Sequence, residues 1–229
     1  MTAAPSPIVF LLDVDNTLLD NDQVIADLQA HMLREFGAPH SARYWEIFEQ
    51  LRRELGYADY LGALQRYRLD ATNDTQLLQM SFFLLDYAFE KRLYPGALDV
   101  LKRLGTAGPT VILSDGDVVF QPHKIRRAGL WHAVNGRVLV YIHKDLMLSG
   151  AAERFPAHHY VMVDDKIRIL SAMKDQWKER LTTVFVRQGH YALDPAIIKE
   201  YAPADVSVER IGDLLQYDLA ALTGASRAR

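Results

Sequence analysis

The fold class is indicated by one segment near the start of the sequence, Ile8-Val9-Phe10-Leu11-Leu12-Asp13-Val14-Asp15-Asn16-Thr17. Its first five residues are apolar without alternation, as in a strand that is buried on both faces of a parallel sheet covered by helices. Two carboxylates then follow, two residues apart. Unit charges about 4 Å apart repel by roughly 4 kcal/mol at an effective dielectric near 20, so a cation or a shared proton must compensate. Magnesium suits such a place, because it prefers oxygen ligands and needs only one or two carboxylates.

Four later apolar runs have the same character, and each is followed by polar or charged residues. They span residues 110–113, 138–142, 160–163 and 183–186. Between them, apolar residues recur at helical spacing over 97–104, 167–177 and 211–222. Alternating strands and helices predict an α/β fold with a Rossmann-like open parallel sheet and right-handed crossovers.

The segment between the first two strands, residues 20–93, shows no strand pattern. Apolar residues recur there at helical spacing in three places, namely 24–36, 44–55 and 77–89. This is far more chain than one crossover connection needs, so we predict an inserted α-helical cap domain over residues 20–93. Tyr94-Pro95-Gly96 marks the return to a core domain made of residues 1–19 and 94–229.

Composition excludes several classes of function. The chain of 229 residues has a formal net charge of -3 with scattered Lys and Arg, so we expect no nucleic-acid or membrane partner. It has no cysteine, which removes disulfides, thiolate nucleophiles and cysteine-ligated metals. The run 8–12 is too short for a signal sequence or membrane span, and a cytoplasmic location is expected. A monomer and a homodimer are both open.

Candidate functional residues follow four of the five predicted strands, at the carboxyl ends where functional groups of open α/β sheets gather. The fifth strand is followed by Arg187, to which the sequence assigns no role. Ser114 offers a hydroxyl to a phosphoryl oxygen, and the backbone amides of the Asp115-Gly116 turn form an anion site. Lys144 can neutralise a carboxylate and a phosphoryl oxygen. Asp164-Asp165 supplies more acid for a metal. Each of these residues alone could equally be a helix cap, a turn residue or a surface charge. The functional interpretation therefore depends on their order along the chain and their placement at strand ends.

In that order the residues resemble the four motifs of the haloacid dehalogenase superfamily. The first is Asp13-Val14-Asp15-Asn16-Thr17, and the second is Ser114 within Leu113-Ser114-Asp115-Gly116. The third is Lys144 within His143-Lys144-Asp145, and the fourth is Val163-Asp164-Asp165. The third motif departs from the common pattern, in which a proline follows the lysine. A helical cap after the first motif is also common in this superfamily.

The resemblance implies a phosphatase that removes a phosphoryl group from a small phosphorylated substrate. Asp13 would be the nucleophile that forms an aspartyl-phosphate, and Asp15 the acid and then the base. Ser114, the Asp115 turn and Lys144 would bind the phosphoryl group. Mg²⁺ would be held by the Asp13 carboxylate, the Asp15 backbone carbonyl and Asp165. Asp164 and Thr17 would lie behind these ligands and support them.

Other functions remain open beside hydrolysis. Transfer of the phosphoryl group to another hydroxyl, as in phosphosugar mutases of the same superfamily, differs only in what the aspartyl-phosphate meets next. Haloacid dehalogenation is disfavoured by Asp15, because a departing halide needs no proton. A non-catalytic phosphate-binding module is disfavoured because the nucleophile, the acid and the metal ligands are all present.

The predicted cap carries aromatic residues that could stack on a substrate ring, although packing within the cap explains most of them better. They are Tyr44, Trp45, Tyr57, Tyr60 and Tyr67. The helical pattern leaves Tyr57, Tyr60 and Arg66 least explained, and these are the expected candidates for substrate contact.

Overall fold

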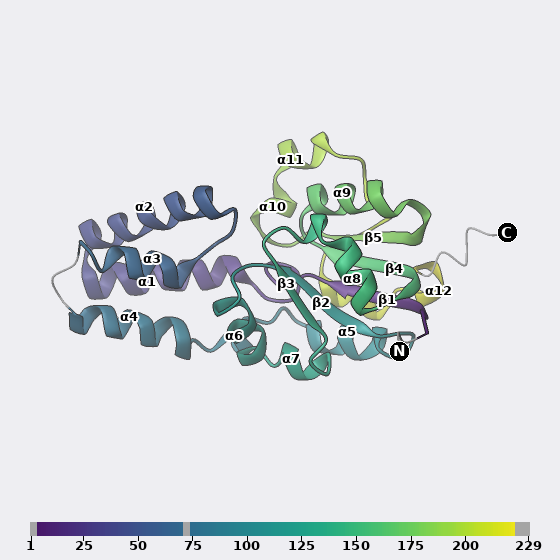
Figure 1. The fold of residues 1–229 in the computed structure, drawn as a ribbon, viewed down its shortest axis with the longest axis horizontal. Coiled ribbons are helices and arrows are strands. Elements are labelled where there is room, and N and C mark those ends of the chain that lie inside the picture. Colours follow the sequence, from purple (N-terminus) through teal and green to yellow (C-terminus); the bar gives the residue numbers. More distant parts are fainter. Residues whose placement is uncertain (1–3, 71–73, 223–229) are drawn as a thin grey trace.

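The computed structural model describes residues 4–70 and 74–222. Its centre is a parallel sheet of six strands in the order β3-β2-β1-β4-β5-β6 (Figure 1). This confirms the predicted Rossmann-like open parallel sheet. The strands are β1 (Ser6–Leu12), β2 (Thr110–Asp115), β3 (Val138–Tyr141), β4 (Ala157–Asp164), β5 (Leu181–Val186) and β6 (Val206–Val208). Of the expected core and cap, residues 1–3, 71–73 and 223–229 lie outside the described residues.

The register of the sheet brings the polar strand ends to one edge. Leu12 on β1 pairs with Ile112 on β2 and with Val163 on β4. On the other side of β2, Ser114 pairs with Val140 of β3. Because all these strands are parallel, the residues that follow them emerge side by side at their carboxyl ends.

Successive side chains of β1 point into two different apolar layers, as a strand buried on both faces requires. Phe10 and Leu12 belong to one layer, and Val9 and Leu11 to the other. The first layer is covered by α5 (Ala97–Leu104), α6 (Phe120–Arg127), α7 (Leu130–Ala133), η4 (Ile211–Leu215) and α12 (Leu219–Leu222). The second is covered by α8 (Leu148–Arg154), α9 (Ile167–Trp177), α10 (Gly189–Leu193) and α11 (Pro195–Glu200), with the short turns η2 (Lys144–Leu146) and η3 (Lys178–Arg180) nearby.

The chain between β1 and β2 is helical and extends beyond the carboxyl-terminal edge of the sheet, at the left of Figure 1. It consists of α1 (Asn21–Phe36), α2 (Ala38–Leu55), α3 (Tyr60–Tyr67), α4 (Asp74–Asp86) and η1 (Phe89–Arg92). Asp20 begins α1 by accepting a hydrogen bond from the Gln23 N–H. A bridge between Leu19 and Leu93 holds the entry and exit of this segment together. We call α1 to α4 the cap.

The apolar stripe of α1 faces the interior of the cap as its spacing predicts, with Val24, Leu28, Met32 and Phe36 all buried. The cap interior is continuous with the core. The ring of Phe120 on α6 lies 5.5 Å from that of Tyr60 and 5.9 Å from that of Phe89. Within the described residues, no helix has both the length and the apolar character that crossing a membrane requires.

The structure contains elements that the sequence did not predict. They are the strand β6 and the short helices α3, α6, α7, α8, α10 and α11. The single helix expected over residues 211–222 is wrong, because η4 ends at Leu215 and a new helix begins at Leu219. The reason is Asp218, whose side chain accepts a hydrogen bond from the Ala220 N–H and so starts the second helix.

Candidate active site

Three buried acids lie together at the carboxyl ends of β1 and β4. Oxygens of Asp13, Asp164 and Asp165 all lie within 4.8 Å of one another. Such a cluster is costly without positive charge, since each carboxylate loses hydration and repels its neighbours. The three carboxylates at these strand ends therefore need nearby cations to remain ionised.

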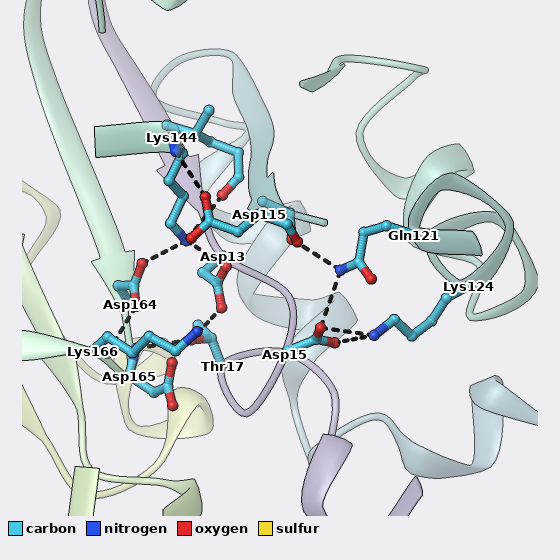
Figure 2. Close-up of polar contacts among 12 residues, drawn as sticks. Asp13, Asp15, Thr17, Asp115, Gln121, Lys124, Lys144, Asp164, Asp165 and Lys166 are labelled. Atoms are coloured by element: carbon cyan, nitrogen blue, oxygen red, sulfur yellow. Dashed lines mark hydrogen bonds and ion pairs between the residues drawn. The ribbon is translucent and has the colours of Figure 1, made fainter. Parts of the chain in front are cut away.

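Lys144, in the turn after β3, supplies one of these cations. Its Nζ lies 2.5 Å from Asp13 Oδ1 and 2.7 Å from Asp164 Oδ2 (Figure 2). Burial alone would lower the pKa of Lys144, but the carboxylates of Asp13 and Asp164 outweigh burial and raise it. The Lys144 backbone N–H donates to Asp115 Oδ1 at 2.7 Å. This bond fixes the turn that departs from the usual third motif.

The two acids of the fourth motif have different surroundings. Burial raises the pKa of Asp164 to about 6, and Lys144 partly offsets that effect. Burial and the neighbouring Asp164 raise the pKa of Asp165 well above its usual range. Both side-chain oxygens of Asp165 are buried and have no hydrogen-bond partner in the part of the chain that the structure describes. Since buried polar atoms are rarely left unpaired, these oxygens point to a ligand.

Thr17 joins the first and fourth motifs. Its hydroxyl donates to Asp13 Oδ2 at 3.4 Å and accepts the Asp165 N–H at 3.0 Å. The Thr17 side chain therefore connects the Asp13 carboxylate with the backbone of Asp165.

Sequence reasoning missed Lys124 and Gln121, both on α6. The Nζ of Lys124 lies 2.6 and 2.7 Å from the two carboxylate oxygens of Asp15. The amide of Gln121 donates to Asp15 Oδ2 at 3.2 Å and to Ser114 Oγ at 2.9 Å. Their one available signal was a polar pair three residues apart on a helix face that also carries the buried Phe120 and Ile125.

Lys166, which follows the fourth motif, was also missed. Burial alone would lower the pKa of its ammonium, but Asp13 and Asp165 raise it. Figure 2 shows the end of this side chain between the carboxylates of Asp13 and Asp165. A lysine two residues after Asp164 was the available signal, although nothing in the sequence distinguishes it from a surface lysine.

The balance of charge leaves room for a divalent cation. Five carboxyl groups surround three ammonium groups, which makes two more acids than bases. The unpartnered oxygens of Asp165 lie beside Asp13, and hard oxygen ligands of this kind suit magnesium. The residues present therefore fit a Mg²⁺ ion held by Asp13 and Asp165. The acids are Asp13, Asp15, Asp115, Asp164 and Asp165, and the bases are Lys124, Lys144 and Lys166.

A cavity of about 530 Å³ leads from this cluster to the cap. Asp15, Asp115 and Lys166 line its inner end. On its rim, Arg52 of α2 donates to the hydroxyl oxygen of Tyr191 on α10 at 2.5 Å, so that cap and core meet there. The cavity can hold a molecule larger than phosphate alone.

The cap aromatics divide into packing and cavity-lining residues. Tyr44 is buried and donates to the Tyr60 backbone oxygen, and Tyr67 is buried against His40. Trp45, Tyr57 and Tyr60 line the cavity. Arg66 pairs with Glu54 at 2.8 Å on the surface and does not line it. Of the three expected candidates, the two tyrosines lie where a substrate could reach them.

A family model for haloacid dehalogenase-like hydrolases matches residues 9–175. None of the curated proteins matches the chain. Among solved structures, a haloacid dehalogenase-like hydrolase from Burkholderia xenovorans LB400 shares 70% identity at a TM-score of 0.88. The match covers 93% of this chain and 100% of that chain.

Two more distant structures share the fold. The HAD-hydrolase YfnB from Bacillus subtilis, whose structure is bound to magnesium, is 16% identical at a TM-score of 0.59, with coverage of 92% and 98%. The L-2-haloacid dehalogenase from Xanthobacter autotrophicus is 18% identical at a TM-score of 0.61, with coverage of 92% and 97%. At these identities the similarity concerns the fold alone.

Proposed function

This chain belongs to the haloacid dehalogenase-like hydrolases, and we propose that it is a Mg²⁺-dependent phosphomonoester hydrolase that acts through an aspartyl-phosphate at Asp13. Its substrate would be a small phosphorylated metabolite. The observation that carries the proposal is the pair of buried, unpartnered Asp165 oxygens beside the buried Asp13 carboxylate. A site with two surplus acids and two free oxygens is prepared for a divalent cation and a phosphate.

In the proposed reaction, Asp13 attacks phosphorus. Lys144 and Thr17 hold its two carboxylate oxygens and fix the orientation of the group. One of these oxygens forms a bond to phosphorus while the bond from phosphorus to the leaving oxygen breaks. The electron pair departs with the leaving oxygen, which takes a proton from Asp15.

The second step returns the enzyme to its starting state. A water oxygen bonds to phosphorus, the bond from phosphorus to the Asp13 oxygen breaks, and Asp15 takes the proton of the water. Ser114 and Lys144 hold the phosphoryl oxygens in both steps. When bound, magnesium supplies positive charge to the transferring phosphoryl group, and Asp13 and Asp165 would hold it.

Asp15 separates this proposal from dehalogenation. A halide leaves without a proton, so a dehalogenase has no use for a second acid beside the nucleophile. Here Asp15 is held at both oxygens by Lys124 and contacted by Gln121, and it lines the cavity. The presence of this second acid beside the nucleophile supports a reaction whose leaving group is an oxygen. As the acid of the first step, Asp15 carries a proton on one oxygen, and Lys124 then donates to the other oxygen alone. Transfer to a second hydroxyl uses the same first step and is the alternative that the experiment must separate.

The test is hydrolysis of para-nitrophenyl phosphate by the wild type and by Asp13→Asn, each measured with Mg²⁺ and with EDTA. We expect phosphate release only in wild type with Mg²⁺. 2-Chloropropionate, with halide release as the readout, and phosphomonoesters offered with sugar hydroxyl acceptors complete the panel. Halide release without phosphate release would contradict the proposal, and phosphate recovered on the acceptor rather than in solution would show a transferase.

A further inference from the structure

The carboxylate of Asp15 is bound by Lys124, a lysine that is itself buried. The side chain of Lys124 is 2% exposed, whereas that of Asp15 is 26% exposed toward the cavity. The ammonium reaches both carboxylate oxygens and also donates to Asn21 Oδ1 at 3.1 Å. Asn21 is the first residue of α1, so Lys124 ties Asp15 to the base of the cap. This is no solvated surface pair, because burying an ammonium is costly and needs full compensation.

Gln121, one turn earlier on the same helix, adds a second link. Its amide nitrogen donates to Asp15 Oδ2 and to Ser114 Oγ, and the side chain is buried. Gly116 permits this approach, because a Cβ there would lie 2.9 Å from Cβ of Gln121. The Gln121 amide thus fixes the distance between the Ser114 hydroxyl and the Asp15 carboxylate.

We infer that Lys124 and Gln121 are positioning residues that aim the Asp15 carboxyl group at the leaving oxygen and later at the attacking water. The inference rests on the proposed function. Proton transfer requires the carboxyl oxygen within hydrogen-bond reach of the reacting oxygen, at about 2.6–3.2 Å. An aspartate side chain that is open to the cavity can rotate away, and these two residues prevent that rotation. Neither residue touches the phosphorus or gives up a proton.

The two half-reactions make this inference testable. With para-nitrophenyl phosphate, the leaving oxygen departs as a stable anion, so forming the aspartyl-phosphate needs no proton from Asp15. With 2-(4-nitrophenyl)ethyl phosphate, the leaving oxygen is an alkoxide and needs that proton. Hydrolysis of the aspartyl-phosphate needs Asp15 as a base with either substrate.

For Lys124→Met we expect kcat with the alkyl ester to fall roughly 100-fold or more, the contribution of a well-placed acid or base, with KM changed by less than about 3-fold. With the aryl ester, about one equivalent of nitrophenolate should appear in a burst, and acid quenching should reveal accumulated aspartyl-phosphate. Gln121→Leu keeps the Lys124 pair and should show the same pattern at smaller amplitude. Arg126→Met, an exposed cation on the same helix, is the matched control and should behave as wild type.

Equal losses with the two esters and no burst would overturn the inference, because a general structural defect slows both half-reactions alike. Should Lys124→Met fail to fold, as judged by its thermal transition, Gln121→Leu decides by the same criterion. A wild-type enzyme that hydrolyses neither ester would instead refute the proposed function, and this inference with it.

Discussion

The ammonium of Lys144 lies 2.5 Å from Asp13 Oδ1, and both side chains are almost completely buried. A second carboxylate, that of Asp164, lies 2.7 Å from the same nitrogen. Removing a buried cation that two acids share costs more stability than the ion pairs themselves contribute, because the carboxylates are then left buried without a positive partner. The first prediction concerns the loss of this cation.

Lys144→Met should destabilise the metal-free protein by about 3–5 kcal/mol, because it strands buried carboxylates without their cation. It should also lower the hydrolysis rate by at least about 100-fold, as loss of a donor to the transferring group does in other enzymes. Urea unfolding in EDTA and the aryl phosphate assay measure the two effects. Adding Asp164→Asn should restore part of the stability and none of the activity. Unchanged unfolding of the single variant would contradict this account.

Asp165→Asn should abolish stabilisation by magnesium. At about 100 times its dissociation constant, a ligand stabilises the folded state by about 2.7 kcal/mol, which raises Tm by about 5–10 °C in a chain of this size. We expect that rise in wild type and almost none in the variant. In EDTA the variant should be at least as stable as wild type, since an unpartnered buried carboxylate is gone. The exposed Asp175→Asn is the control.

Ionisation of Asp164 should lower the stability of the metal-free protein as the pH rises from about 4 to 6. The pKa of Asp164 is about 6 in the folded protein, against about 3.9 for an unfolded aspartate. Between these values the folded state binds more protons than the unfolded state, so raising the pH favours unfolding. Magnesium requires ionised carboxylates, and its stabilising effect should therefore grow over the same range.

Thermal unfolding at pH 5 and pH 7, each with Mg²⁺ and with EDTA, checks this prediction. The gain in Tm on adding Mg²⁺ should be larger at pH 7. Asp164→Asn should flatten the pH dependence seen in EDTA. A gain that is larger at pH 5 would contradict the assignment of the cluster as a metal site.

The sequence was sufficient to predict which residues meet at the strand ends. A continuous apolar strand that stops at Asp13 has its position fixed by the sheet, and the parallel register then determines the neighbours of that aspartate. The same argument brings Lys144 and the Asp164-Asp165 pair to the site. Short elements such as β6, with three residues, carry too little periodicity to be recognised.

The partners of Asp15 could not be predicted in this way. Lys124 and Gln121 reach the site from within a helix, and their placement depends on how α6 packs beneath the cap. In the sequence, nothing distinguishes Lys124 from the other cations near the end of that helix. Its burial is visible only in the structure. The same limit applies to Trp45, because the sequence favours packing within the cap for its aromatic residues and does not show that Trp45 lines the cavity.

Trp45→Phe should weaken substrate binding without affecting the chemical step. Trp45 lines the cavity, and its Nε1 is buried without a hydrogen-bond partner among the described residues. Its ring packs edge-on against Tyr44 and Phe48, contacts that phenylalanine can keep. A hydrogen bond to an uncharged acceptor contributes about 1 kcal/mol, so KM for the best natural phosphomonoester should rise roughly 5-fold with kcat unchanged. The aryl phosphate is the control substrate, since its KM should stay the same if its short ring does not reach the indole. An unchanged KM for every phosphomonoester in the panel would show that the indole N–H faces no substrate and that Trp45 serves the packing of the cap.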